Sequence, residues 1–238
     1  MWNWFIGMKN IKLKLPLSLN AIKLKDFQKY VKILEANPDA DKDFLDIKLM
    51  EIFCGLKYAN IASLPVGIFD ETVMILTNMF QAKTPLVNRF KMVGSDGAEV
   101  EFGFIPNLDN ITMGEYIDLT NYLGDIDDMH KAMAVLYRPI HPSYEGRESY
   151  RISSYEGTAA YSEILKDMPL DIAIGAKVFF WTLGKKLSIL MTNYFQREAQ
   201  EMTELSEEER KDLIASMHGI KNSMLSQEVK HLKLMTLR

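Results

Sequence analysis

The sequence is poor in cysteine, because Cys54 is the only one among 238 residues. A single cysteine cannot form an internal disulfide, which fits a reducing compartment or a protein assembled in one. Cys54 follows Phe53 in an apolar segment, and we therefore expect an inert, buried thiol.

The sequence also lacks a long, uncharged apolar run. The strongest run, from Ile172 to Met191, is interrupted by Lys177, Lys185 and Lys186, whereas a membrane-spanning helix needs about 18 or more apolar residues with few charges. This run is therefore predicted to be a buried core helix. The first residues lack the basic start and the long apolar run of a signal peptide, so no membrane segment is predicted.

Recognisable catalytic motifs are missing as well. The Gly-Xaa-Ser-Xaa-Gly, Walker-type and dinucleotide-binding glycine patterns do not occur. No His-x-x-x-His or Cys-x-x-Cys pair provides the spacing of a zinc site; the histidines are His130, His141, His218 and His231. We therefore predict no catalytic, cofactor-binding or metal-ligating residues and no enzymatic activity, with an uncharacterised enzyme as an alternative.

The chain has slightly fewer basic than acidic residues: it contains 28 Lys and Arg and 32 Asp and Glu residues, and its net charge is -4. This balance argues against a general nucleic-acid binder. Seven lysines nevertheless lie between Lys9 and Lys32, with Asp26 as the one acid close among them. The cluster would suit an acidic partner or a weak contact with the DNA backbone, although a solvated face is the simpler interpretation.

Amphipathic helical patterns account for most of the chain. The predicted helices cover about 24–35, 44–53, 69–81, 112–124, 125–138, 158–167, 169–202, 206–217 and 223–234. Alternating residues predict a short N-terminal strand over 11–15 and a β-hairpin over 86–104. We therefore predict a mainly α, α+β fold. It has a single helical domain over residues 1–203 and a C-terminal helical extension over 204–238 that packs on neighbours.

The segment from Gly103 to Ile140 is rich in side chains that enzymes use: Glu115, Asp118, Asp125, Asp127, Asp128, His130, Tyr137 and Arg138. Thr112 and Glu115 fit a capping box, and we expect Glu115 and Asp118 to point outward. The three later aspartates lie where a second helix would begin, so their charges complement the helix dipole. His130 is expected at the surface or beside a helix cap. The whole segment is therefore predicted to be structural.

The same region carries a family resemblance. The segments "FGFIPNLDNITMGEYIDLTNYL…MHKAMAVLYRPI…YRISSYEG" and "MPLDIAIGAKVFFWTLGKKL" resemble a family of small proteins encoded among the virion and tail genes of tailed bacteriophages, above all crAss-like and related phages of Bacteroidetes hosts. The resemblance covers residues 102–187 well, the N-terminal helices loosely and the C-terminal residues hardly at all. It brings no catalytic motif and implies a structural or assembly role.

What the resemblance implies is a virion protein, assembled in the host cytoplasm, that forms a neck ring between portal and tail. Its partners would be copies of itself (often about twelve in such rings), the portal and other neck or tail proteins. A tail assembly chaperone absent from the mature virion is the alternative. The apolar N-terminal residues Trp2, Trp4, Phe5 and Ile6 need a docking place, either on a partner or on the chain's own core.

Overall fold

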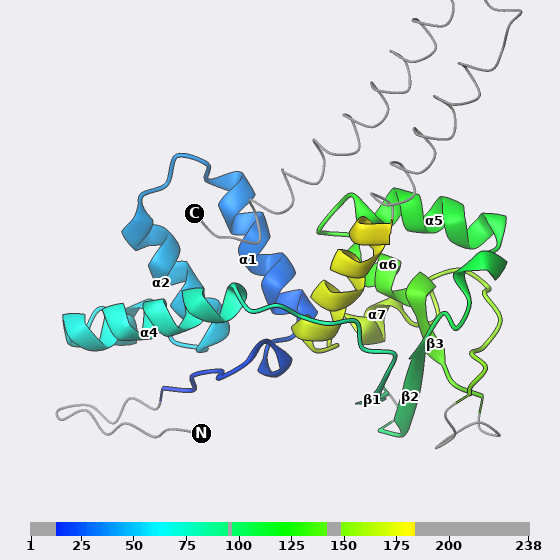
Figure 1. The fold of residues 1–238 in the computed structure, drawn as a ribbon. Helices are drawn as coiled ribbons and strands as arrows, with labels where there is room; N and C mark the ends of the chain where they lie inside the picture. The colour runs from blue at the N-terminus through cyan, green and yellow to red at the C-terminus, as the bar shows by residue number, and fades with distance from the viewer. Residues whose placement is uncertain (1–12, 95–96, 142–148, 184–238) are drawn as a thin grey trace, which may run out of the picture. The chain divides into compact units, whose positions relative to one another are not determined.

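The computed structural model describes residues 13–94, 97–141 and 149–183. These residues form helices and a small antiparallel sheet (Figure 1), so the predicted mainly α, α+β fold is confirmed. The chain divides into two compact units, residues 1–176 and 177–238, and every labelled element belongs to the first. The predicted boundary between residues 203 and 204 lies outside the described residues and stays a prediction.

The N-terminal part of the fold is helical. Its elements are the 3-10 helix η1 (Leu19–Ala21), α1 (Leu24–Ala36), α2 (Lys42–Phe53), α3 (Tyr58–Ile61) and α4 (Val66–Phe80). The predicted helices correspond to α1, α2 and α4, whereas the four-residue α3 is too short to show a helical period. Asp41 accepts the backbone N–H of Phe44 at 2.7 Å and caps α2, which explains why α2 begins ahead of its predicted start.

Aromatic side chains hold these helices together. The ring centres of Phe27 and Phe80 are 5.8 Å apart, those of Phe53 and Phe80 5.2 Å, and those of Tyr30 and Phe53 5.4 Å. This contact range is typical of stabilising aromatic pairs. Cys54 is buried directly after α2, and burial raises the pKa of its thiol to about 12. The expectation of a buried thiol is thus confirmed, and the raised pKa agrees with the expected low reactivity.

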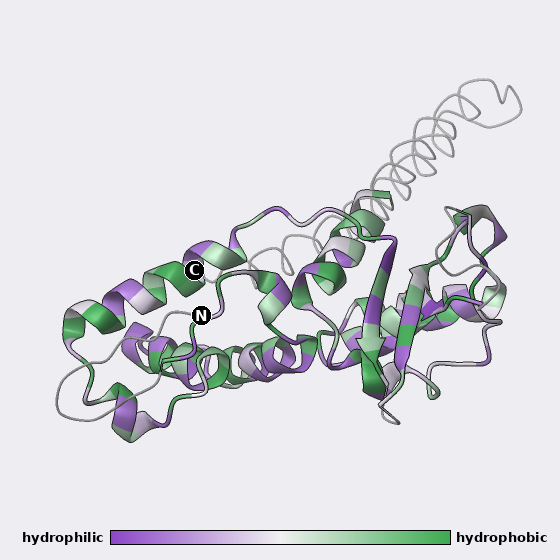
Figure 2. Ribbon diagram, turned by 90° about the horizontal axis from the view of Figure 1, so that it is seen from below, coloured by the Kyte–Doolittle hydropathy of each residue, from purple (hydrophilic) through white to green (hydrophobic). Residues whose placement is uncertain are grey.

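The sheet of the described residues is antiparallel in the order β1-β2-β3. Strands β1 (Arg89–Val93) and β2 (Glu99–Phe104) confirm the hairpin predicted over 86–104, and hydropathy alternates along both of them (Figure 2). β1 is an edge strand, and its Arg89 and Lys91 form ion pairs of 2.9 and 2.8 Å with Glu101 and Glu99 of β2.

The third strand, β3 (Tyr137–Pro139), was not predicted. The expected helix over 125–138 ends at Leu136, and the next residues pair with β2 in the register Gly103 to Arg138. The helix therefore ends before Pro139, which was expected to stop it and instead is the last residue of the strand. A strand of three residues is too short for an alternating pattern to reveal it.

The short N-terminal strand predicted over 11–15 is not observed. Residues 13–15 lie in no strand, and residues 11 and 12 are outside the described range. Leu13 is buried and Lys14 is exposed, so the alternation correctly reports which side chains are hidden. A strand also needs a hydrogen-bonded partner, and the pattern of one segment contains no information about that partner.

The β-strands are accompanied by the 3-10 helix η2 (Leu108–Asn110) and by α5 (Met113–Leu123), α6 (Met129–Leu136) and α7 (Ser162–Leu165). Seven of the eight residues of α6 are buried, and α6 contacts α5, α7 and β3. This short helix is therefore the centre of the core in this part of the fold.

Residues 170–183 are also helical, in agreement with the predicted core helix that starts after Pro169. Its early residues Ile172, Ala173 and Ile174 are buried, whereas Phe180 and Trp181 are half-buried. The rest of the predicted helix lies outside the described residues. Nowhere in the ranges that the structure describes is a helix both long and apolar enough to cross a membrane.

Gly175 marks a close approach between this helix and the segment before the sheet. A Cβ on Gly175 would lie 2.3 Å from the carbonyl oxygen of Pro85. Real Cβ atoms do not come so near to backbone, so the approach requires glycine at this position.

Replacing Gly175 by Ala should therefore destabilise the protein by about 1–3 kcal/mol, the usual cost of overpacking. The intrinsic helix preference of Ala over Gly acts in the opposite direction and is worth up to about 1 kcal/mol. Gly114 in α5 is the matched control, because the nearest atom to its added Cβ is 4.0 Å away. Urea denaturation should show a loss for Gly175→Ala and no loss for Gly114→Ala; equal midpoints would contradict the close approach.

Candidate functional site

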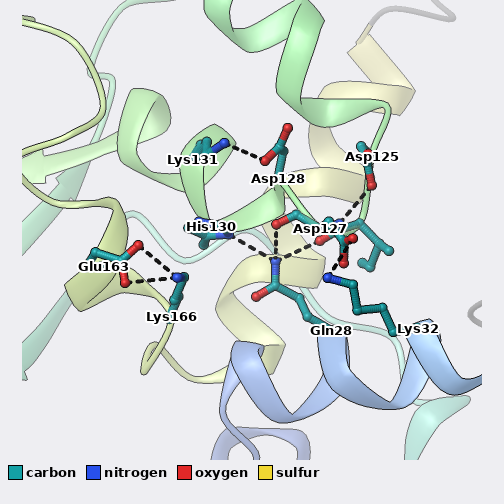
Figure 3. Close-up of polar contacts among 10 residues, drawn as sticks. Gln28, Lys32, Asp125, Asp127, Asp128, His130, Lys131, Glu163 and Lys166 are labelled. Carbon is teal, nitrogen blue, oxygen red and sulfur yellow. Dashed lines mark hydrogen bonds and ion pairs between the residues drawn. The ribbon is translucent and has the colours of Figure 1, made fainter.

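Most of the residues singled out between Gly103 and Ile140 belong to two separate polar clusters, whereas Tyr137 is fully buried apart from them and its hydroxyl donates to the carbonyl oxygen of Val87 at 2.7 Å. The first, called the Arg138 cluster, consists of Thr112, Glu115, Asp118, Arg138 and Tyr155. The second, called the α1–α6 joint, consists of Gln28, Lys32, Asp127 and His130 (Figure 3).

The Arg138 cluster is built on a buried ion pair. The Nη1 atom of Arg138 in β3 lies 2.5 Å from Oε1 of Glu115 in α5, and the two residues are only 6% and 4% exposed. The other oxygen of Glu115 accepts the backbone N–H and the hydroxyl of Thr112, both at 2.7 Å. The Thr112 hydroxyl in turn accepts the N–H of Glu115 at 3.2 Å. The predicted capping box is thus confirmed.

The expected outward direction of Glu115 is wrong. Its place in the helical pattern gave no sign of a partner, because Arg138 is remote in the sequence and belongs to the strand that was not predicted. Burial raises the pKa of Glu115, but the hydrogen bonds from Thr112 and the charge of Arg138 outweigh it, so the pKa lies below its ordinary value of 4.5. Glu115 is therefore ionised at neutral pH.

Tyr155 closes the cluster from a loop. Its ring centre is 5.5 Å from the guanidinium carbon of Arg138, a cation–π distance. Its hydroxyl donates a hydrogen bond to Asp118, which turns this half-buried carboxylate toward the protein. Burial and the hydrogen bond to Asp118 both raise the pKa of Tyr155. Asp118, like Glu115, was expected to point outward and instead has an internal partner.

A pocket of about 200 Å³ adjoins Arg138. It is lined by Arg138, Ser153, Ser154, Glu156, Gly157, Ala160 and Tyr161. Glu115 already neutralises Arg138, and Glu156 adds a negative charge, so the pocket offers no net attraction for an anion. Within the described part of the chain, Nε of Arg138 has no hydrogen-bond partner. The pocket is therefore suited to water or a small neutral polar group.

The α1–α6 joint is centred on the amide of Gln28. Its Nε2 atom lies 2.7 Å from the carbonyl oxygen of Ile126, 3.0 Å from that of Asp127 and 3.1 Å from Nδ1 of His130. Lys32, one turn further along α1, forms a 2.8 Å ion pair with Asp127 (Figure 3). These contacts connect α1 with the turn before α6 and with α6 itself.

His130 is buried, with 6% of its surface exposed, so the expected surface position is wrong; the alternative, a position beside a helix cap, fits, because His130 is the second residue of α6 after its N-cap Asp128. The acidic residues before it suggested an exposed helix start, whereas α6 is enclosed by its neighbours. Gln28 was missed altogether. Its signal was nevertheless available, because Gln28 shares the buried face of α1 with Leu24, Phe27 and Val31, and a polar residue on such a face requires a partner.

The acidic residues before α6 have structural contacts, as predicted, but mainly as ion-pair partners and not as helix caps. Asp128 pairs with Lys131 at 2.7 Å, and Asp125 accepts the N–H of Asp127 at 2.9 Å. No group of three His, Cys, Asp or Glu residues in the described ranges could hold a metal ion.

Part of the N-terminal lysine cluster is also used internally. Lys23 and Lys25 both contact Asp167, at 2.8 and 2.7 Å, and Lys32 contacts Asp127. Lys14 and Lys29 are exposed, and Lys9 and Lys12 lie outside the described residues. The internal pairs reduce the charge that the cluster could present to DNA or to an acidic partner.

No protein-family model, no curated protein and no solved structure matches the chain. The phage resemblance therefore stays a prediction. In both clusters the charged side chains have partners within the same chain.

Replacing Glu115 by Ala should cost about 3–5 kcal/mol of unfolding free energy, because Arg138 would remain buried without a counter-charge. Thr112→Ala, which removes only the hydroxyl of the cap, should cost about 1 kcal/mol. Urea denaturation at neutral pH would measure both losses. Similar small losses of unfolding free energy in the two variants would contradict the predicted stabilisation by the Glu115–Arg138 ion pair.

The same ion pair predicts a pH dependence. Because the pKa of Glu115 is lower in the folded than in the unfolded protein, its contribution is complete above the ordinary value of 4.5 and is lost as the pH falls below it. Glu115→Gln resembles the protonated side chain. The stability difference between the wild type and Glu115→Gln should therefore shrink as the pH is lowered from about 6 to about 3, and a constant difference would contradict the assignment.

Proposed function

We propose that this chain is a non-enzymatic structural subunit of a tailed-phage virion, present as a ring of identical copies at the neck between portal and tail. The phage context rests on the resemblance of residues 102–187. The structural role is supported by the two clusters, whose carboxylates and histidine are engaged in a capping box, ion pairs and an α1–α6 contact.

The observation that carries the proposal is the exposed face of α5. Met113, Tyr116 and Ile117 are 72%, 56% and 49% exposed and lie at the i, i+3, i+4 spacing of one helical face. The only charged residues of α5, Glu115 and Asp118, are turned toward Arg138 and Tyr155. The first two turns of this face are therefore apolar and uncharged, as in the core of a protein interface, and the exposed Thr120 and Asn121 continue it as a polar border.

A second set of exposed apolar side chains lies on α3 and α4. Tyr58, Val66 and Met74 are 60%, 74% and 56% exposed. A ring of identical subunits needs two different complementary surfaces on each copy, because every copy contacts its neighbours head to tail. The α5 face and this second set provide such a pair, and the proposed contact joins them between adjacent copies. Neither surface alone approaches the roughly 800 Å² per partner of a standard interface, so the ring would add further contacts.

The double substitution Met113→Ser and Tyr116→Ser should leave the fold intact, since both side chains are exposed, and should weaken self-association at least about tenfold, as losses at central apolar contacts do. Met74→Ser should act in the same direction. Leu17→Ser is the matched control, because Leu17 is 61% exposed but belongs to neither surface. Native mass spectrometry over a concentration series measures the effect, and equal association of all variants would contradict the proposed contact.

Purified particles of the phage that encodes the chain test its place in the virion. A neck-ring subunit should be found by quantitative mass spectrometry in a fixed ratio to the portal protein, with copy numbers on the order of ten, as closed rings require. If the protein is present in infected cells but absent from mature particles, the proposed ring role is wrong and the role of a tail assembly chaperone is favoured.

A further inference from the structure

The amide orientation of Gln28 is fixed by its surroundings. Its NH2 group faces two backbone carbonyl oxygens, those of Ile126 and Asp127, at 2.7 and 3.0 Å. If the amide were rotated by about 180°, its oxygen would face the two carbonyl oxygens. All three oxygens are acceptors, so no hydrogen bond could form among them. The two hydrogens of this nitrogen are shared among the two carbonyls and Nδ1 of His130, 3.1 Å away, so the contact is favourable only when Nδ1 carries no proton and accepts. In this arrangement the ring is neutral and carries its proton on Nε2.

Protonation of His130 would reverse this contact. Nδ1 would acquire an N–H that points at the N–H of Gln28, so two donors would face each other in a site that is almost closed to water. The charged groups around the ring do not favour either state strongly. They are three acids and three lysines: Asp128 at the N-cap of α6 with Lys131, Glu163 of α7 with Lys166 directly after it, and Asp127 with Lys32 of α1 (Figure 3).

We propose that Gln28 and His130 form a pH-sensitive latch between α1 and α6, closed with a neutral ring and opened by protonation. Burial, followed by the charge of Lys166, lowers the pKa of His130, which agrees with a neutral ring in the closed state. The proposal is independent of the proposed virion role.

The latch acts on a defined part of α1. The beginning of α1 is held by other contacts: Lys23 and Lys25 pair with Asp167, and the backbone N–H groups of Leu24 and Lys25 donate to the carbonyls of Met168 and Lys166 at 3.0 and 2.8 Å. None of these involves His130. Opening should therefore loosen residues 28–36 of α1, which keep the Tyr30–Phe53 and Lys32–Asp127 contacts, while the first turn remains attached.

Linkage gives the direction of the effect. The folded state resists protonation of His130, so the closed state is fully stable above the ordinary pKa of 6.5 and loses stability as the pH falls below it. The carboxylates with lowered pKa, Glu115, Glu163 and Asp167, have ordinary values of 4.5, 4.5 and 3.8, and they act at lower pH. A loss of stability between about pH 7 and 5 would therefore result from the protonation of a histidine.

Hydrogen exchange of the full-length chain, corrected for the intrinsic effect of pH, tests the latch. When the pH is lowered from about 7.5 to 5.5, the fraction of molecules in which residues 28–36 are opened should increase. The increase should be at most about tenfold per pH unit, which is the limit for a single coupled proton. Residues of α4 are the internal reference and should not respond.

Two variants make the test specific. His130→Gln provides an acceptor oxygen for Gln28 that does not titrate, so the pH response of α1 should disappear. His141→Gln removes an exposed histidine and should leave the response unchanged. A response that survives in His130→Gln, or is lost in His141→Gln, overturns the latch. If His130→Gln does not fold, ring nitrogen spectra of the wild type decide, and a protonated Nδ1 at about pH 7.5 would exclude it.

Discussion

Much of the fold beyond the N-terminal helices is organised around one buried positive charge. A guanidinium at the position of Arg138 would be very costly to bury without a negative partner. Glu115 meets this requirement, and in doing so it fixes how the start of α5 lies against β3. The same carboxylate completes the capping box of α5, so helix initiation and charge neutralisation depend on a single side chain. Tyr155 then covers the guanidinium and turns Asp118 inward.

This arrangement has an effect on the surface of α5. Because both of its acids are used inside, the helix presents Met113, Tyr116 and Ile117 to solvent with no charge beside them. Exposed apolar faces of this kind are uncommon on chains that remain monomeric. The internal contacts of Glu115 and Asp118 and the apolar exposed residues of α5 are thus two results of the same sequence. The proposed subunit role rests on this connection.

The sequence predicted those features that depend on local patterns. The period of apolar residues located α1, α2, α4, α5 and the hairpin, and the Thr112–Glu115 spacing located the capping box. Partners that are distant in the sequence could not be predicted. The contacts of Glu115 with Arg138 and of Gln28 with His130 join residues brought together only by the tertiary fold. For that reason the outward directions expected for Glu115 and Asp118 and the surface position expected for His130 were wrong, and the structural role of the acidic segment stays a prediction.

The edge strand β1 has a consequence for how copies of the chain meet. An unpaired strand edge can recruit the edge of another sheet and lead to aggregation. The charged side chains of Arg89 and Lys91, held by Glu101 and Glu99, lie along this edge, and adding a second identical strand would bring like charges together. The edge of the sheet is thereby protected against the addition of a further strand.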